Sequence, residues 1–316
     1  MKVLVTRDIP FIGIDLLKKK GFEVSVYKKD QPISKNELVK SVKNCDGVIS
    51  MLSDKFDKEI IDSMDRCKVI ANYAVGFNNI DIEYAKSKGI IVTNTPDVLT
   101  DSTADLTIAL VLSCARKISE SEKLVRDKKF VGWKPKLLLG MELRNKYFGI
   151  LGAGRIGTAV AKRANSFGCK ILYYSNSKNE YLNKELSAKK LSLNSILKKS
   201  DIISLHLPLN KKSKNLLSKE KLALLKPSSI FINTARGEIV DESYLIKMLK
   251  QNKIASAGFD VYQNEPNLNK EFYELKNVVL LPHIGSATME ARNNMSLLAA
   301  KNVIAVLLGK RAITSV

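Results

Sequence analysis

Short apolar runs alternate with amphipathic stretches along almost the whole chain. In the first part, each apolar run is followed by a stretch whose apolar positions have helical spacing. This alternation indicates βαβ units and a parallel sheet. The strands predicted for this part are 3–6, 23–27, 46–52, 68–73 and 89–94, and the helices between them include 33–43, 54–64 and 81–88.

The alternation is interrupted after the fifth strand and then resumes. Pro96 ends that strand, because proline cannot donate to a β-ladder. Ser102 and Asp105 form the start signal of one long helix that runs to Val125. A helix of about 24 residues is about 36 Å long, enough to bridge two domains. The strands predicted beyond it are 147–151, 170–175, 201–207, 229–235, 254–260 and 277–282.

The last predicted helix, 288–308, follows the final strand and has no strand of its own to serve. We therefore expect the chain to cross back at this point and to pack on the first domain. The length of 316 residues also favours two domains, each large enough for its own hydrophobic core.

The composition is that of a globular protein and argues against several other classes. Hydrophobic residues make up 45% of the chain and charged residues 27%, which excludes a largely disordered protein. No apolar run approaches the roughly 20 residues that a membrane-spanning helix needs. Arg7 and Asp8 argue against a signal peptide. We expect no membrane partner.

The formal net charge of +20 raises the question of nucleic-acid binding. The lysines form scattered pairs and triplets without interleaved aromatic residues, so a solvated lysine-rich surface is the better interpretation. We therefore expect no nucleic-acid partner. The cysteines lack C-x-x-C spacing and nearby histidines, which indicates unpaired thiols, no metal site and a reducing, cytoplasmic location. They are Cys45, Cys67, Cys114 and Cys169.

The segment GAGRIG (152–157) is a G-x-G-x-x-G motif in an informative setting. It follows the apolar run 147–151 and opens a helical pattern. Gly152 allows a tight turn, Gly154 lets the backbone approach a pyrophosphate, and Gly157 allows close packing of helix and strand. The helix N-terminus adds free N–H groups and a partial positive charge. These features predict dinucleotide binding rather than an ordinary βα turn.

The end of the next strand bears on the choice of cofactor. An NAD-selective site normally has an acidic residue about 20 residues further on, which binds the ribose hydroxyls. Ser175 occupies that place here, and the next acid is Glu180. Ser175, Asn176 and Ser177 can donate to a 2′-phosphate, and Lys178 can neutralise it. We expect NADP to be preferred and NAD to remain possible, although a polar surface turn without a cofactor role is the alternative.

Three predicted strands end in candidate catalytic residues, at the edge where open α/β sheets bind ligands. Arg236 could bind the carboxylate of a 2-oxo acid through two parallel hydrogen bonds. Glu265 and His283 could pair across adjacent strand ends, and such a carboxylate keeps an imidazolium charged near neutral pH. The imidazolium could donate a proton to a ketone as hydride arrives. Asp260 could accept from the nicotinamide amide or stabilise the cationic ring.

Each of these residues also has an ordinary structural interpretation. Arg236 could form a surface ion pair, Glu265 could begin a loop, and His283 could end a strand. Their common place at strand ends, after a phosphate-binding turn, favours catalysis. His206 is the only other histidine and the rival acid/base, but no acid lies near it in sequence. We expect it to pack or to border the cofactor.

Taken together, these motifs resemble those of the D-2-hydroxyacid dehydrogenases and, within them, the glyoxylate/hydroxypyruvate reductase branch. The resemblance covers nearly the whole chain, and it departs from many NADP-dependent relatives in having Asn176 and Lys178 where they carry arginine. The segments that carry it are GAGRIG (152–157), NTARG (233–237), GFDVYQNEP (258–266), LPHIGSAT (281–288), MLSDK (51–55), NYAVGFNNID (72–81), NTPDVLTDSTADL (94–106) and GWKPKLLLG (132–140).

The resemblance implies an α/β fold of two doubly wound parallel-sheet domains, one Rossmann-like and one flavodoxin-like. The cofactor domain would be inserted into a discontinuous substrate domain. Residues 1–98 and 286–316 would form the substrate-binding, catalytic domain, and residues 99–285 the NAD(P)-binding Rossmann domain. Substrate would bind in the cleft, and hinge closure would exclude water.

The resemblance also implies roles for individual residues. The backbone N–H groups of Val75 and Gly76 would bind the substrate carboxylate together with Arg236, and Leu52 and Ser53 would line the substrate pocket. The implied catalytic residues are Arg236, Glu265 and His283. The residues implied around the cofactor, besides those at 175–178, are Thr103, Gly152, Ala153, Gly154, Arg155, Ile156, Gly157, Leu207, Thr234, Ala235, Asp260 and Gly285.

The implied activity is the NAD(P)H-dependent reduction of small 2-oxo acids, with glyoxylate and hydroxypyruvate first, to 2-hydroxy acids of D configuration. Hydride would go to C2 and the proton would come from His283. The alternatives are another 2-oxo acid, such as 2-ketogluconate, pyruvate or 3-phosphohydroxypyruvate, or a dinucleotide-sensing interaction protein of the same fold. The resemblance further implies a homodimer, in which Trp133 would approach the neighbouring subunit's site unless it is a core residue.

Overall fold

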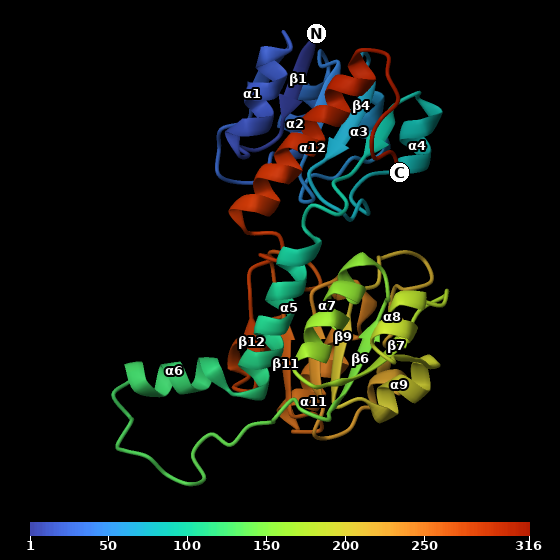
Figure 1. The fold of residues 1–316 in the computed structure, drawn as a ribbon. Coiled ribbons are helices and arrows are strands. Elements are labelled where there is room, and N and C mark those ends of the chain that lie inside the picture. Colours follow the sequence, from blue (N-terminus) through green and yellow to red (C-terminus); the bar gives the residue numbers. More distant parts are fainter. The chain divides into compact units, whose positions relative to one another are not determined.

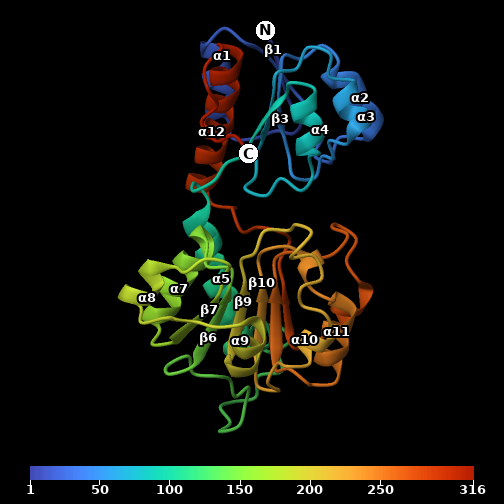
Figure 2. The same ribbon diagram turned by 90° about the vertical axis from the view of Figure 1, so that its right-hand side faces the viewer.

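The computed structural model describes residues 1–316, which form two compact units. The first unit consists of Met1–Leu99 and Ser286–Val316, and the second consists of Thr100–Gly285 (Figure 1). Each unit contains one parallel sheet with helices on both faces (Figure 2). The predicted α/β class with an inserted second domain is confirmed. None of the helices combines the length and hydropathy that a membrane span requires.

The sheet of the first unit has the strand order β2-β1-β3-β4-β5. All its pairs are parallel, and every residue of β3 and β4 is buried, as expected for strands covered on both faces. This is the doubly wound order of flavodoxin-like domains. The strands are β1 (Lys2–Val5), β2 (Glu23–Val26), β3 (Gly47–Ser50), β4 (Val69–Asn72) and β5 (Ile91–Thr93).

Helices α1 and α12 of the first unit come from opposite ends of the chain and pack together. The Gly13 N–H donates to Ser296 Oγ at 3.2 Å, and that hydroxyl donates to the Pro10 carbonyl at 2.7 Å. A Cβ at Gly13 would collide with the Ser296 backbone, so glycine permits this approach. The helices of this unit are α1 (Phe11–Lys19), α2 (Lys35–Val42), α3 (Lys58–Asp62), α4 (Ile82–Ser87) and α12 (Met289–Leu307).

The sheet of the second unit has the order β12-β11-β10-β9-β6-β7-β8. From β8 to β11 this is the classic Rossmann order, in which successive strands are added on one side of β6 and then, from β9 on, on its other side. The strands are β6 (Tyr147–Leu151), β7 (Lys170–Tyr174), β8 (Lys189–Lys190), β9 (Ile202–Leu205), β10 (Ile230–Asn233), β11 (Ser256–Phe259) and β12 (Val278–Leu280). The helices are α5 (Thr100–Ala115), α6 (Ile118–Arg126), α7 (Arg155–Ser166), α8 (Glu180–Glu185), α9 (Leu193–Lys199), α10 (Lys219–Leu222) and α11 (Glu242–Lys250).

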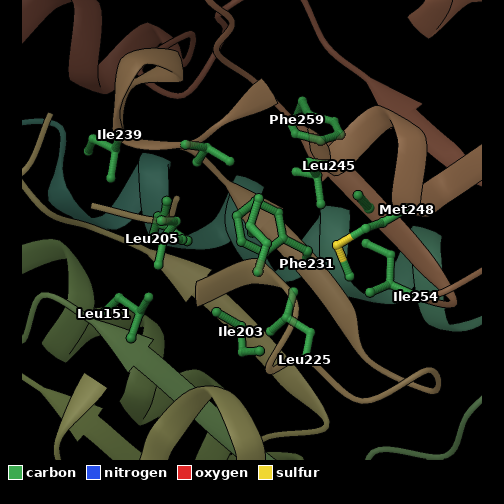
Figure 3. Close-up of a cluster of buried hydrophobic side chains, with 14 of the residues drawn as sticks. Leu151, Ile203, Leu205, Leu225, Phe231, Ile239, Leu245, Met248, Ile254 and Phe259 are labelled. Atoms are coloured by element: carbon green, nitrogen blue, oxygen red, sulfur yellow. The ribbon is translucent and has the colours of Figure 1, made fainter. Parts of the chain in front are cut away.

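A hydrophobic core on one face of this sheet supports the strand ends that carry the candidate catalytic residues. Phe231 and Phe259 come from neighbouring strands and lie in this core with Leu245 of α11 (Figure 3). The ring centroids of Phe259 and Phe272 are 4.9 Å apart, in an edge-to-face arrangement. All four side chains are almost completely buried, so β10 and β11 rest on a close-packed layer.

The prediction of one long helix from Ser102 to Val125 is wrong. The structure has two helices, α5 and α6, and Lys117 between them has a φ of 50°, in the left-handed region. A later segment of the chain binds the last carbonyl of α5, because the Met141 N–H donates to the Ala115 oxygen at 2.8 Å. This tertiary hydrogen bond ends the helix at a place that has no local stop signal. The start is also wrong, since α5 begins two residues before Ser102.

The segment after α5 exposes many apolar side chains. Helix α6 has no buried residue. Val131 is 78% exposed and Trp133 is 84% exposed, so Trp133 is not a core residue. The eleven predicted strands are present; β1 begins one residue earlier than predicted, and the other strand ends are shorter by at most two residues. The two-residue strand β8 was not predicted.

We expect Gly13→Ala to lower the free energy of unfolding by about 1–3 kcal/mol, because the added methyl group must force α1 and α12 apart. Chemical denaturation measures this loss. Lys19→Ala, on the exposed side of the same helix, is the matched control and should change stability little. Equal stability of Gly13→Ala and the wild type would contradict the packing described for these two helices.

Candidate active site

The glycine-rich turn connects β6 to α7 at the point where the strand order of the second sheet reverses. Gly152 has a φ of 104°, and a Cβ there would lie 2.6 Å from the His206 carbonyl oxygen. A Cβ at Gly157 would collide with the Gly152 oxygen, so helix and strand pack at the distance that only glycine permits. Gly154 is the N-cap of α7, and the space around it is open. The surroundings of Gly152 and Gly157 therefore fit a tight turn and close packing, and the open space at Gly154 leaves room for a ligand.

The turn has the features of a dinucleotide phosphate site. The first N–H groups of a helix have no intrahelical acceptor, and in α7 these belong to the turn that contains Arg155 and Ile156. The Ala153 carbonyl accepts from Asn179 Nδ2 at 3.0 Å. The same amide donates to Thr158 Oγ1, so Asn179 connects the glycine turn to the first part of α7.

The residues Ser175 to Lys178 follow β7, next to the glycine turn, and all are at least partly exposed. Lys178 Nζ lies 3.3 Å from Glu180 Oε1, and both side chains are more than half exposed. Lys190 of β8 donates from Nζ to the Asn176 carbonyl at 3.0 Å. This second cation beside the loop was missed from the sequence, because it belongs to the unpredicted strand β8.

The candidate catalytic residues stand at the carboxyl ends of three neighbouring strands, β10, β11 and β12. Phe259 at the end of β11 is in register with Asn233 of β10 and with Leu280 of β12. The segments that continue from these strands therefore start side by side. Arg236, Glu265 and His283 all lie on these continuations, within the second unit.

His283 and Glu265 form a hydrogen-bonded pair across 18 residues of sequence. His283 Nδ1 lies 2.7 Å from Glu265 Oε2, and the two side chains are 26% and 29% exposed. The other Glu265 oxygen accepts from the Tyr262 N–H at 2.8 Å. Burial opposes the ionisation of Glu265, but the hydrogen bond and charge of His283, the Tyr262 N–H and the Arg236 charge outweigh it and lower its pKa.

Arg236 is held in an extended backbone conformation beside this pair. Its Nη1 donates to the Ala235 carbonyl at 2.7 Å. Burial lowers the pKa of its guanidinium, and the charges of Glu265 and Glu238 oppose that shift. The next residue, Gly237, lies so close to the backbone at Tyr262 that a Cβ would collide with it. This close approach brings the Arg236 segment up to the segment that carries Glu265.

Asp260 is 1% exposed and holds the chain that follows His283. Its two carboxylate oxygens accept from the N–H groups of Ile284, at 2.7 Å, and Gly285, at 2.8 Å. His283 itself has a φ of 57°, in the left-handed region that residues other than glycine seldom adopt. Burial raises the pKa of Asp260, and the two N–H groups and the His283 charge oppose that effect.

Two threonines of α5 line the same edge of the sheet. Thr103 Oγ1 donates to the Gly285 carbonyl at 3.2 Å. Thr107 donates to the Thr103 carbonyl and lies 3.0 Å from Thr234 Oγ1. Helix α5 is thereby attached to the segments that follow β10 and β12. Thr107 was not among the predicted residues, although it stands one helical turn after Thr103.

His206 follows β9, next to the glycine turn, and is not part of the His283 pair. Its Nε2 lies 2.9 Å from Ser204 Oγ. Burial lowers the pKa of His206 to about 3, so this imidazole is neutral at physiological pH. Leu207 follows it at the same edge and is partly exposed. A neutral imidazole without a carboxylate partner is a poor proton donor, which favours the packing role over the catalytic one.

The remaining predicted residues belong to the first unit. Leu52 and Ser53 follow β3, and they line a cavity of about 310 Å³ whose wall includes Arg7, Tyr73 and Arg292. Val75 and Gly76 follow β4 in the same sheet and are partly exposed. Both loops thus lie at the carboxyl edge of the first sheet. Arg7 and Arg292 were not predicted from the sequence.

The chain has no cluster of three or more histidine, cysteine or acidic side chains that could hold a metal ion. The four cysteines are free and buried. Burial raises the pKa of Cys67 and of Cys114 to about 12, so these thiols are uncharged.

Comparison with known proteins places the chain in a family. The pattern described as "D-isomer specific 2-hydroxyacid dehydrogenase, NAD binding domain" matches residues 108–285. The chain is 47% identical over 313 residues to the glyoxylate reductase of Thermococcus litoralis, covering 98% of this chain and 94% of that one. It is also 47% identical to the glyoxylate reductase of Pyrococcus horikoshii, covering 96% and 92%.

Solved structures agree in fold. A Thermus thermophilus protein superposes with a TM-score of 0.94 at 41% identity, over 100% of both chains. The NADPH-dependent glyoxylate/hydroxypyruvate reductase of Sinorhizobium meliloti, solved with NADP and malonate, gives a TM-score of 0.87 at 31% identity, over 100% of this chain and 96% of that one. With its fold, its glycine turn and these likenesses, the chain belongs to the D-isomer specific 2-hydroxyacid dehydrogenases, which are NAD(P)-dependent oxidoreductases.

Proposed function

We propose that this enzyme reduces small 2-oxo acids, with glyoxylate and hydroxypyruvate as the leading substrates, to 2-hydroxy acids of D configuration. The observation that carries the proposal is the hydrogen-bonded pair of His283 and Glu265, beside the partly buried Arg236 and on the same sheet edge as the glycine turn. The names of two relatives, a glyoxylate reductase and a glyoxylate/hydroxypyruvate reductase, support the same substrates.

His283 is the proposed proton donor. Its Nδ1 is engaged by Glu265, so Nε2 is the atom left to face the substrate carbonyl oxygen. A reduced nicotinamide bound at this edge would supply the hydride to C2. As negative charge develops on the carbonyl oxygen, Nε2–H donates its proton, and the Glu265 carboxylate stabilises the imidazolium beforehand. Glu265 suits this task because its lowered pKa keeps it ionised.

The carboxylate of the substrate is the proposed ligand of Arg236 and of two backbone N–H groups, those of Val75 and Gly76. A planar guanidinium matches a carboxylate with two parallel hydrogen bonds and holds the 2-oxo acid in one orientation. Leu52 and Ser53 would line the pocket on the substrate side.

The glycine turn fits the pyrophosphate of a nicotinamide dinucleotide, because the space at Gly154 is open and the N-terminus of α7 faces it. Asp260 would accept from the nicotinamide carboxamide through lone pairs that its backbone N–H donors leave free. The other proposed cofactor contacts are Thr103, Gly152, Ala153, Arg155, Ile156, Gly157, Leu207, Thr234, Ala235 and Gly285.

We further propose that NADP is preferred over NAD. The support is the absence of an acid at the end of β7 and the three polar residues Ser175, Asn176 and Ser177, which can donate to a 2′-phosphate. Lys178 and Lys190 would add positive charge beside it. The Glu180 partner of Lys178 moderates that charge, which leaves room for some use of NAD.

The quaternary arrangement proposed is a homodimer formed through the segment after α5. Val125, Phe130, Val131 and Trp133 of this segment are each more than half exposed, which is unusual for a group of large apolar side chains. A second copy of the chain would cover them and bring Trp133 toward the neighbouring site. The free cysteines support a reducing, cytoplasmic location.

His283→Ala should lower the turnover number with glyoxylate and NADPH by about 10²–10⁴-fold, the usual contribution of a general acid. NADPH binding, measured by fluorescence titration, should be unchanged because His283 is not part of the phosphate-binding turn. His206→Ala is the comparison that separates the two histidines. Near-normal turnover of His283→Ala would refute its assignment as the proton donor.

Glu265→Gln should move the pH dependence of reduction. The pKa of Glu265 is lowered, so the carboxylate is ionised throughout pH 5–8 and stabilises the protonated form of the pair. The neutral amide of glutamine cannot stabilise the protonated form in this way. The pH at which the rate of reduction falls to half should therefore shift downward. Glu238→Gln, which removes a nearby acid that does not bond His283, is the matched control. Identical pH profiles of Glu265→Gln and the wild type would rule out this role.

The double variant Ser175→Asp with Lys178→Ala should shift the ratio of kcat/KM for NADPH to that for NADH by at least about tenfold toward NADH. The new carboxylate repels a 2′-phosphate and accepts from a ribose hydroxyl. Lys189→Ala, adjacent to Lys190 and exposed, serves as the charge control. An unchanged ratio of kcat/KM for the two cofactors would contradict the proposal that these residues bind the 2′-phosphate.

A further inference from the structure

Three consecutive carbonyl groups in the loop after β4 are each held by a hydrogen bond from outside the loop. The Ala74 oxygen accepts from the Thr95 N–H at 2.9 Å. The Val75 oxygen accepts from Asn94 Nδ2 at 2.9 Å, and the Gly76 oxygen accepts from Asn72 Nδ2 at 2.8 Å. No other loop of the first sheet has its backbone anchored in this way by two asparagine side chains.

These bonds also fix the N–H groups of the loop. In a planar trans peptide the C=O and the N–H point in opposite directions, so holding one aims the other. The held carbonyls of Ala74, Val75 and Gly76 therefore aim the N–H groups of Val75, Gly76 and Phe77. None of these three N–H groups donates to another group of the chain, and the residues are at least partly exposed. Unpaired N–H groups held in fixed directions are suited to bind an anion.

Asn72 is part of a buried amide network that reaches a second loop. It is fully buried, and its Oδ1 accepts from Ser50 Oγ at 3.1 Å. Its Nδ2 lies 3.2 Å from Asn79 Oδ1, and Asn79 Nδ2 donates to the carbonyls of Met51 and Asp54 at 3.1 and 3.0 Å. A side-chain amide can donate and accept in this manner, whereas a carboxylate has no donor.

The second loop is held from its other side by a buried acid. Asp54 is 2% exposed, and its Oδ2 accepts from Thr6 Oγ1 at 2.5 Å and from the Met51 N–H at 2.8 Å. Residues 51–54 contain Leu52 and Ser53. The loops after β3 and β4 are thus connected by one set of buried hydrogen bonds.

We infer that Asn94 and Asn72 are positioning residues for substrate binding, which aim the N–H groups of Val75, Gly76 and Phe77 at the carboxylate of the 2-oxo acid. The inference rests on the proposed function, which assigns the carboxylate to this loop. The carboxylate keeps its charge and position while C2 is reduced, so these contacts are equally strong in the ground state and in the transition state. Interactions of that kind lower KM and leave kcat unchanged.

The test is Asn94→Ala, because the side-chain amide of Asn94 donates to the Val75 carbonyl. We expect KM for glyoxylate to rise roughly tenfold, with kcat and KM for NADPH changed by less than about twofold. If Asn94 had only a structural role, its substitution would lower the stability of the protein without raising KM for glyoxylate selectively. Asn94→Ser, which is shorter but still polar, replaces the alanine variant if that one does not fold. Asn277→Ala is the matched control, because the Asn277 amide donates to backbone carbonyls as the Asn94 amide does. Its two acceptors, however, lie in the second unit.

A second readout needs no substrate. We expect the ¹⁵N order parameters of Val75 and Gly76 to be those of a rigid backbone in the wild type and to fall below about 0.6 in Asn94→Ala. If the wild type consumes no NADPH with any 2-oxo acid, the proposed function fails, and the order parameters alone decide whether the asparagines hold the loop. Unchanged order parameters in Asn94→Ala, or an unchanged KM in an active enzyme, would overturn the inference.

Discussion

The hydrogen bond between Glu265 and His283 is the interaction on which the catalytic account depends. The two residues lie on the segments that follow β11 and β12, and they meet because these strands are parallel neighbours in register. A slip of one strand by one residue would turn its side chains to the opposite face of the sheet and displace the segment that follows it. The buried aromatic layer under β10 and β11 prevents such a slip, so the hydrophobic core holds the chemistry in place.

Holding several partly buried charges together at this edge would be costly without compensation. The carboxylate oxygens of Glu265 and Asp260 each accept at least one backbone N–H or imidazole hydrogen bond. Arg236 lies close enough to interact with the Glu265 charge. Each negative group is therefore balanced by a fixed donor. The N–H groups that bind Asp260 belong to the two residues after His283. The hydrogen bonds that balance the Asp260 charge therefore also fix the left-handed backbone of His283.

Much of this could be predicted from the sequence because it depends on local pattern. The strands follow from short apolar runs, and the glycine turn from its place between a strand and a helix. The meeting of Glu265 and His283 follows from parallel strands whose carboxyl ends share one edge. The break between α5 and α6 could not be predicted, since it depends on the Met141 N–H reaching Ala115 from across the fold. The contacts of Lys190 and of the Asn94 amide could not be predicted for the same reason, because their partners are distant in sequence.

The central claim is that Glu265 acts only through His283, and a double-mutant cycle measures this most directly. Turnover with glyoxylate and NADPH is compared among the wild type, His283→Ala, Glu265→Gln and the variant that carries both substitutions. If the two side chains form one functional unit, Glu265→Gln will slow the wild type but will cost nothing further in the His283→Ala background. Effects that multiply, so that the double variant is slower by the product of the two single losses, would contradict the account.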